Sequence, residues 1–126
     1  MPTILIVEDN ADNLSLTVLL LESAGYTVLS AVDAEAGLML AQSGQPDLIL
    51  MDIHLPGMDG LEATALLKSD AATAAIPVFA LTALAMKGDE ARIRAAGCDG
   101  YIEKPIRIHV FLSTIAARLN LPLPVP

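Results

Sequence analysis

The stretch LMDIHLPGMDG, residues Leu50 to Gly60, joins an apolar run to a turn, with a carboxylate at the junction. The run ends at Asp52, and Pro56, Gly57 and Gly60 follow. A charge at the end of a buried segment costs free energy unless it is paired, solvated or used. The rest of the chain has to separate these three explanations.

The composition indicates one domain with an aliphatic core. The chain has 126 residues, of which 54% are hydrophobic and only 3% aromatic, and this length suits a single domain. The net charge of -8 argues against direct nucleic-acid binding, because phosphate contacts need clustered Lys and Arg. Cys98 is the single cysteine, so no intramolecular disulfide can form. Without a secretory signal or an apolar run of membrane-spanning length, we expect a cytoplasmic protein with no membrane insertion.

Short apolar runs alternate with helical patterns along the chain. The predicted strands are Thr3–Val7, Tyr26–Ser30, Asp47–Met51, Ile76–Leu81 and Gly100–Ile102. The first predicted helix contains Leu14–Leu21 and stops at Gly25. The second runs from a cap at Asp33 to Gly44, and the third from a cap at Asp59 through Lys68. The last two cover about Leu84–Ala96 and Ile108–Leu119.

This alternation predicts an α/β fold. Five β-α units imply a parallel sheet with right-handed crossovers and helices on both faces. The flavodoxin-like doubly wound (βα)5 order, 2-1-3-4-5, is the natural arrangement. We expect residues 1–120 to form this domain. Residues 121–126, LPLPVP, form a Pro-rich tail that cannot extend a helix, and we expect no output domain.

Polar residues gather where the predicted strands end. Glu8 and Asp9 follow the first strand, Asp52 the third, Thr82 the fourth and Lys104 the fifth. The carboxyl ends of parallel strands meet at one edge, where such folds bind ligands. Three carboxylates at this edge repel each other, and Mg²⁺, or Mn²⁺, resolves the repulsion by binding their oxygens together with a phosphate.

Each of these residues alone has an ordinary structural explanation. Glu8 and Asp9 can belong to a polar loop that caps a helix, and Asp52 can cap the turn before Pro56. Thr82 is a common helix N-cap type, and a single Lys is usually solvated. Their joint placement on one predicted edge favours a binding site.

The sequence resembles the receiver domains of two-component response regulators from Thr3 to about Leu119. The segments ILIVEDN, PDLILMDIHLPGMDG, LTA and YIEKP match that family in order and at the usual separations. The resemblance extends to stand-alone, DivK-like receivers and to the receivers of hybrid kinases. It implies that Asp52 is the phosphoacceptor. The donor would be a phosphohistidine on a sensor histidine kinase or a histidine phosphotransfer protein.

The resemblance also implies a metal site. Glu8, Asp9 and Asp52 would hold Mg²⁺, with the backbone carbonyl of His54 as a further ligand. Glu8 stands where Asp is common in the family.

Other roles follow from the same resemblance. Lys104 would pair with the phosphate, and Thr82 and Ala83 would contact the phosphoryl oxygens. Tyr101 would be the aromatic switch residue, and the Lys104–Pro105 peptide bond would be cis.

Two surfaces are candidates for partner binding. The apolar patch of residues 84–86 opens the fourth predicted helix, and with Tyr101 and the last helix it resembles the face by which receivers bind targets. An ordinary surface explains the patch equally well. Phosphodonors in the family typically dock around Asn13 and Leu14.

The leading interpretation is a single-domain response regulator that signals by protein contact. It is not an enzyme but a self-phosphorylating switch, and it loses its phosphate by autodephosphorylation. A receiver cut from a hybrid kinase, or a phosphorelay shuttle, remains an alternative. An aspartyl-nucleophile phosphatase would need an acid two residues after the nucleophile, where this chain has His54. A flavin module would need a Ser/Thr/Gly-rich loop where this chain has EDNADN.

Overall fold

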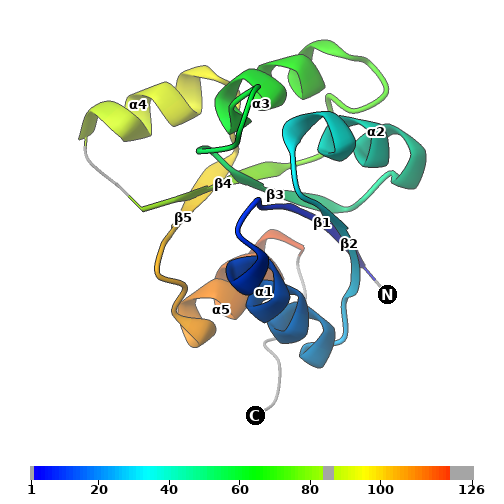
Figure 1. The fold of residues 1–126 in the computed structure, drawn as a ribbon, viewed down its shortest axis with the longest axis vertical. Helices are drawn as coiled ribbons and strands as arrows, with labels where there is room; N and C mark the ends of the chain where they lie inside the picture. The colour runs from blue at the N-terminus through cyan, green and yellow to red at the C-terminus, as the bar shows by residue number, and fades with distance from the viewer. Residues whose placement is uncertain (1, 84–86, 120–126) are drawn as a thin grey trace.

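The computed structural model describes residues 2–83 and 87–119, and in these ranges it has one parallel sheet (Figure 1). The strand order β2-β1-β3-β4-β5 confirms the predicted doubly wound fold. The strands are β1 Thr3–Val7, β2 Thr27–Ala31, β3 Leu48–Asp52, β4 Val78–Thr82 and β5 Gly100–Glu103.

Helices cover both faces of this sheet. They are α1 Ala11–Ser23, α2 Ala34–Gly44, α3 Gly60–Ser69, α4 Lys87–Ala95 and α5 Ile108–Arg118. Figure 1 shows α1 and α5 on one face and α2, α3 and α4 on the other. None of the helices that the structure describes has the length and apolar character of a membrane span.

The central strands are buried on both sides, as their continuous apolar sequence predicts. Successive residues of β1 enter different cores: Ile4 and Ile6 pack in one, Leu5 and Val7 in the other. The core on the α1/α5 side also contains Phe111. This double burial holds the ends of β1 and β3 in fixed positions.

Several element boundaries differ from the prediction. The fourth strand begins at Val78 rather than Ile76, because Pro77 has no N–H to give to the ladder. The second helix ends at Gly44, as predicted, and the next residue, Gln45, has the left-handed conformation, at φ 43°. The described part of α4 begins at Lys87, and the predicted patch of residues 84–86 lies outside the described residues, as does the tail 121–126.

The predicted N-caps of α2 and α3 are present. The carboxylate of Asp33 accepts a hydrogen bond from the backbone N–H of Ala36, and that of Asp59 accepts one from Glu62, both at 2.8 Å. These bonds satisfy N–H groups that the first turn of a helix leaves without partners. The cap at Asp59 fixes the start of α3, directly after the loop that follows Asp52.

Candidate functional site

The fold brings the predicted polar residues to one rim of the sheet. Asp52 and Thr82 are the last residues of β3 and β4, and Glu8 and Lys104 come directly after β1 and β5. Since all these strands are parallel neighbours, their carboxyl ends lie together. This placement follows from the strand order, and it brings together the polar residues that were predicted to lie at the strand ends.

Lys104 is the centre of this rim. Its Nζ donates to Glu8 Oε1 and to Asp52 Oδ2, each at 2.7 Å. The two carboxylate side chains are only 2% and 6% exposed, while that of Lys104 is 20% exposed. Burial of charge is costly unless the charges are paired and hydrogen-bonded, so one ammonium compensates two buried acids.

Asp52 has a second hydrogen-bond donor. The backbone N–H of His54 lies 2.8 Å from Asp52 Oδ1, so His54 and Lys104 donate to different oxygens of this carboxylate. The chain turns directly after β3, and this turn aims the His54 N–H back at the carboxylate. The imidazole of His54 is exposed.

The pKa values of the two buried acids shift in opposite directions. Burial first, and then the hydrogen bond with Asp52, raise the pKa of Glu8 to about 7, although Lys104 acts to lower it. Burial alone would also raise the pKa of Asp52, but hydrogen bonds with Glu8, Lys104 and the His54 N–H lower it overall. Lys104 has a raised pKa, because its bonds to Asp52 and Glu8 outweigh its own burial. Of the two acids, Asp52 therefore has the environment that favours the ionised carboxylate.

The same acids form a candidate cation site. One oxygen from each of Glu8, Asp9 and Asp52 lies within 4.8 Å of the others. Glu8 and Asp52 are buried, whereas Asp9 is exposed. A set of carboxylate oxygens that is open to solvent on one side suits Mg²⁺, which prefers oxygen ligands and retains waters.

Thr82 is buried on the neighbouring strand. Its backbone carbonyl accepts a hydrogen bond from the Lys104 N–H at 2.8 Å. Ala83, the next residue, is exposed. This backbone hydrogen bond therefore joins the ends of β4 and β5 beside the ion pair of Asp52 and Lys104.

Tyr101 lies in β5 and is half-buried. It packs against the core on the α2–α4 side, and with Val110 and Phe111 it lines a cavity of about 420 Å³ between β5 and α5. The Lys104–Pro105 peptide bond that follows is cis.

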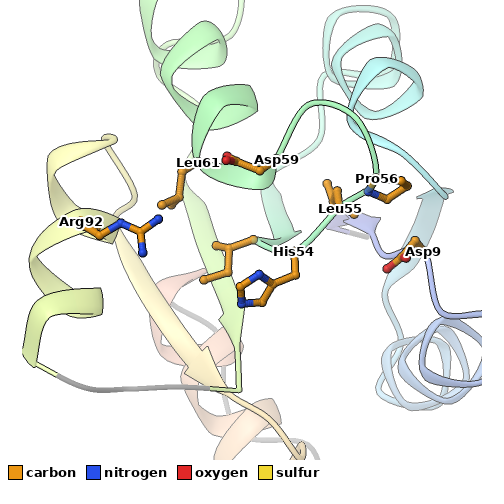
Figure 2. A pocket seen from close by; sticks show the side chains of 8 residues that line it. Asp9, His54, Leu55, Pro56, Asp59, Leu61 and Arg92 are labelled. Carbon is orange, nitrogen blue, oxygen red and sulfur yellow. The ribbon is translucent and has the colours of Figure 1, made fainter.

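Two openings flank the rim. One, of about 380 Å³, is lined by Asp9, Ile53, His54, Leu55, Pro56, Asp59, Leu61 and Arg92 (Figure 2). The other, of about 360 Å³, lies beside α1 and is lined by Glu8, Asn13, Leu16, Thr17, Ala83, Lys104, Pro105 and Ile106. Sequence reasoning did not select Arg92, because a charged residue on an amphipathic helix carries no signal of which loop it faces.

Comparison with known proteins agrees with this geometry. Residues 4–116 match the family described as the response regulator receiver domain. The polar-differentiation response regulators DivK of Brucella anthropi and Brucella ovis are 49% identical over 118 residues, covering 94% of this chain and 96% of theirs.

Solved structures show the same fold. The chemotaxis response regulator CheY4 of Vibrio cholerae has a TM-score of 0.89 at 26% identity, over 94% of this chain and 98% of that one. The receiver domain of sensor histidine kinase PA1611 from Pseudomonas aeruginosa, solved with magnesium coordinated in its active-site cleft, has a TM-score of 0.88 at 32% identity, over 94% and 98%. Phosphoryl-transfer signalling is the general role of such domains. The chain belongs to the response regulator receiver domain family.

Proposed function

We propose that Asp52 is the phosphoacceptor of this receiver. The donor would be a phosphohistidine on a sensor histidine kinase or a histidine phosphotransfer protein. The observation that carries the proposal is the geometry around the Asp52 carboxylate: it is buried, and its two oxygens accept from the Lys104 ammonium at 2.7 Å and from the His54 N–H at 2.8 Å. These donors lower the pKa of Asp52. An ionised carboxylate held in a fixed position, with its neighbours Ile53 and Lys104 each lining an opening, is suited to nucleophilic attack.

The chemical step needs positioning more than covalent help. A carboxylate oxygen of Asp52 attacks phosphorus, a P–O bond forms, and the P–N bond to the donor imidazole breaks. The imidazole leaves with the electron pair and is then protonated. Charge on the transferring group spreads over its oxygens, and the Lys104 ammonium, already beside Asp52, is the protein group that can pair with them.

Glu8, Asp9 and Asp52, with the backbone carbonyl of His54, would hold Mg²⁺ or Mn²⁺. The cation, when bound, neutralises charge on the phosphoryl oxygens. The clustering of three carboxylate oxygens supports this set. The magnesium in the related receiver of PA1611 is consistent with it.

Phosphorylation would then act on the β4–β5 side of the rim. We assign Thr82 and Ala83 as contacts for the phosphoryl oxygens, because Thr82 ends β4 beside Lys104 and Ala83 follows it. A phosphate adds charge and acceptor oxygens, and a shift at Thr82 would change the setting of Tyr101 on the next strand. The target would bind over α4, β5 and α5, where Tyr101 and Val110 line a cavity.

We further propose that residues 1–120 act as one switch domain that signals through protein contact, with residues 121–126 as a tail. The family match over residues 4–116 supports these bounds. Loss of the phosphate by autodephosphorylation would reset the switch, since an acyl phosphate at this half-open rim is accessible to water.

The test is phosphorylation with acetyl phosphate and Mg²⁺, followed by mapping of the phosphate. We expect one acid-labile phosphate per chain, and its complete loss in Asp52→Asn. Asp47→Asn, at the opposite end of β3, is the matched control and should be phosphorylated like the wild type. Labelling of Asp52→Asn at the wild-type rate would contradict the assignment, and repeated turnover of a phosphate ester would favour a phosphatase.

A further inference from the structure

The opening between the β3–α3 loop and α4 differs chemically from the opening beside α1. Its volume of about 380 Å³ is within the range of small-molecule sites. Asp9 and His54 line it, so it adjoins the rim that holds Asp52. Ile53, Leu55 and Leu61 give it an apolar lining. A small molecule that enters it would lie against Ile53 and His54, the two residues that follow the proposed phosphoacceptor in the chain.

Arg92 is the only Lys or Arg among the described residues that line this opening. Figure 2 shows its guanidinium extending from α4 toward His54 and Leu61, with Asp9 on the far side. Within the described residues it makes one ion pair, from Nη1 to Asp89 at 3.4 Å. A guanidinium has five N–H donors, so most of its donor capacity is available to a ligand.

The opening beside α1 offers no such cation. Its single Lys or Arg among the described lining residues is Lys104, and this ammonium is bound to Glu8 and Asp52. Among the described residues of the two openings, Arg92, with a side chain 67% exposed, is therefore the cation available to meet an incoming anion. Asp9 and Asp59 lie in the same opening. When the proposed cation is bound at Asp9, Asp59 still repels an anion, and Arg92 offsets that charge.

We propose that Arg92 guides small, doubly negative phosphoryl donors into this opening and so sets the rate at which they reach Asp52. The proposal rests on Asp52 being the phosphoacceptor. Arg92 is a positioning residue, because it acts on the donor before the chemical step. Such electrostatic guidance raises association rates and is weakened by salt.

Acetyl phosphate is the test donor. An Asp52 carboxylate oxygen attacks its phosphorus, the bond from phosphorus to the acetate oxygen breaks, and acetate leaves with the electron pair. Phosphoramidate transfers the same group with ammonia as the leaving group, but carries less net negative charge at neutral pH. A charge effect of Arg92 must therefore be larger for acetyl phosphate than for phosphoramidate.

The experiment compares Arg92→Gln with Arg94→Gln. Arg94 lies on the same helix and pairs with Glu90 at 3.5 Å, but it does not line the opening. Both variants remove one exposed positive charge from α4. The measurement is the second-order rate of Asp52 phosphorylation by each donor with saturating Mg²⁺, at low and high ionic strength, together with the lifetime of the phosphoaspartate.

For Arg92→Gln with acetyl phosphate, we expect a rate about three- to tenfold lower at low salt, and a difference that vanishes at high salt. The effect should be smaller with phosphoramidate. The lifetime should not change, because water is uncharged. Arg94→Gln should match the wild type in every assay.

Equal rates for Arg92→Gln and Arg94→Gln would overturn the role of Arg92 while leaving Asp52 as the phosphoacceptor. A parallel change in phosphorylation rate and phosphoaspartate lifetime would also overturn it, because that pattern indicates a disturbed site rather than guidance. A wild-type protein that acquires no phosphate on Asp52 would instead remove the proposed function itself.

Discussion

At the scale of single residues, the charge balance of the rim depends on Lys104. Its ammonium is the group that compensates the buried Glu8 and Asp52. In Lys104→Met both acids lose this partner, and we expect a loss of unfolding free energy of about 1–3 kcal/mol at neutral pH, below the usual range for a fully buried pair because Glu8 can take up a proton. Urea unfolding measures this loss.

Excess Mg²⁺ separates this explanation from general damage. A cation bound to the folded state adds stability by mass action, so Mg²⁺ should restore much of what Lys104→Met loses. Lys68→Met is the control, since Lys68 binds Asp99 and two backbone carbonyls away from the rim. Equal effects of Mg²⁺ on both variants would contradict the role given to Lys104.

Much of this rim could be predicted from sequence. The positions of Glu8, Asp52 and Lys104 at strand ends follow from the β-α order, because parallel strands bring those ends together. The shared bonds of Lys104, and the different pKa values of Glu8 and Asp52, could not be predicted, since they depend on distances of a few ångströms. Arg92 was missed because the rotation of α4 about its axis is set by packing.

At the scale of elements, the junction of β3 and α3 depends on a glycine. A Cβ added to Gly60 would meet backbone atoms of Asp52 and would lie 2.8 Å from the Cα of Ile53. Backbone cannot yield as a side chain can. We expect Gly60→Ala to destabilise the fold by about 1–3 kcal/mol and to slow phosphorylation, because the turn that orients Asp52 must shift.

Gly44→Ala provides the comparison. Its added Cβ would meet only the end of the Leu29 side chain, which can move, and alanine favours the helix. We expect unfolding free energy within about 0.5 kcal/mol of the wild type and an unchanged phosphorylation rate. If urea unfolding shows the two substitutions to be equally mild, close packing at Gly60 does not hold the junction.

Element boundaries show where sequence patterns lose precision. Hydrophobic runs located every strand along the chain. The start of β4 was less precise: it begins only after Pro77, because strand pairing needs N–H donors. α2 ends at Gly44 as predicted, but the left-handed residue that follows it is Gln45, although glycine is the residue type that usually adopts this conformation. Such ends depend on local hydrogen bonds: Gln45 donates from its side chain to the Ala41, Gln42 and Ala72 carbonyls.

At the scale of the whole molecule, Asp99 connects several elements at the amino ends of β4 and β5, opposite the rim. Its Oδ2 accepts from the Val78 N–H at 2.8 Å and from Lys68 Nζ at 3.0 Å. Lys68 also donates to the Ile76 carbonyl at 2.7 Å. These bonds join α3, the start of β4 and the loop before β5. They add polar contacts between three segments that otherwise meet only through side-chain packing in the core.

Asp99 also makes stability depend on pH. Burial alone would raise its pKa, but hydrogen bonds from Val78 and Lys68 and the charges of Lys68 and Arg118 lower it below 3.8. A carboxyl with a lowered pKa in the folded state stabilises that state above its unfolded pKa and loses this effect as pH falls through the folded value. The contribution is therefore full at neutral pH and declines below about pH 4.

Asp99→Asn should consequently cost about 1–2 kcal/mol of unfolding free energy at pH 7, and the gap to the wild type should narrow as pH falls below about 4. Asp89→Asn removes the same charge from an exposed pair on α4 and should cost less than about 0.5 kcal/mol at pH 7. Urea unfolding from pH 7 to pH 3 measures both. A gap for Asp99→Asn that stays constant across this range would mean that the ionised carboxylate is not what joins the three elements, leaving its shape and neutral hydrogen bonds as the cause.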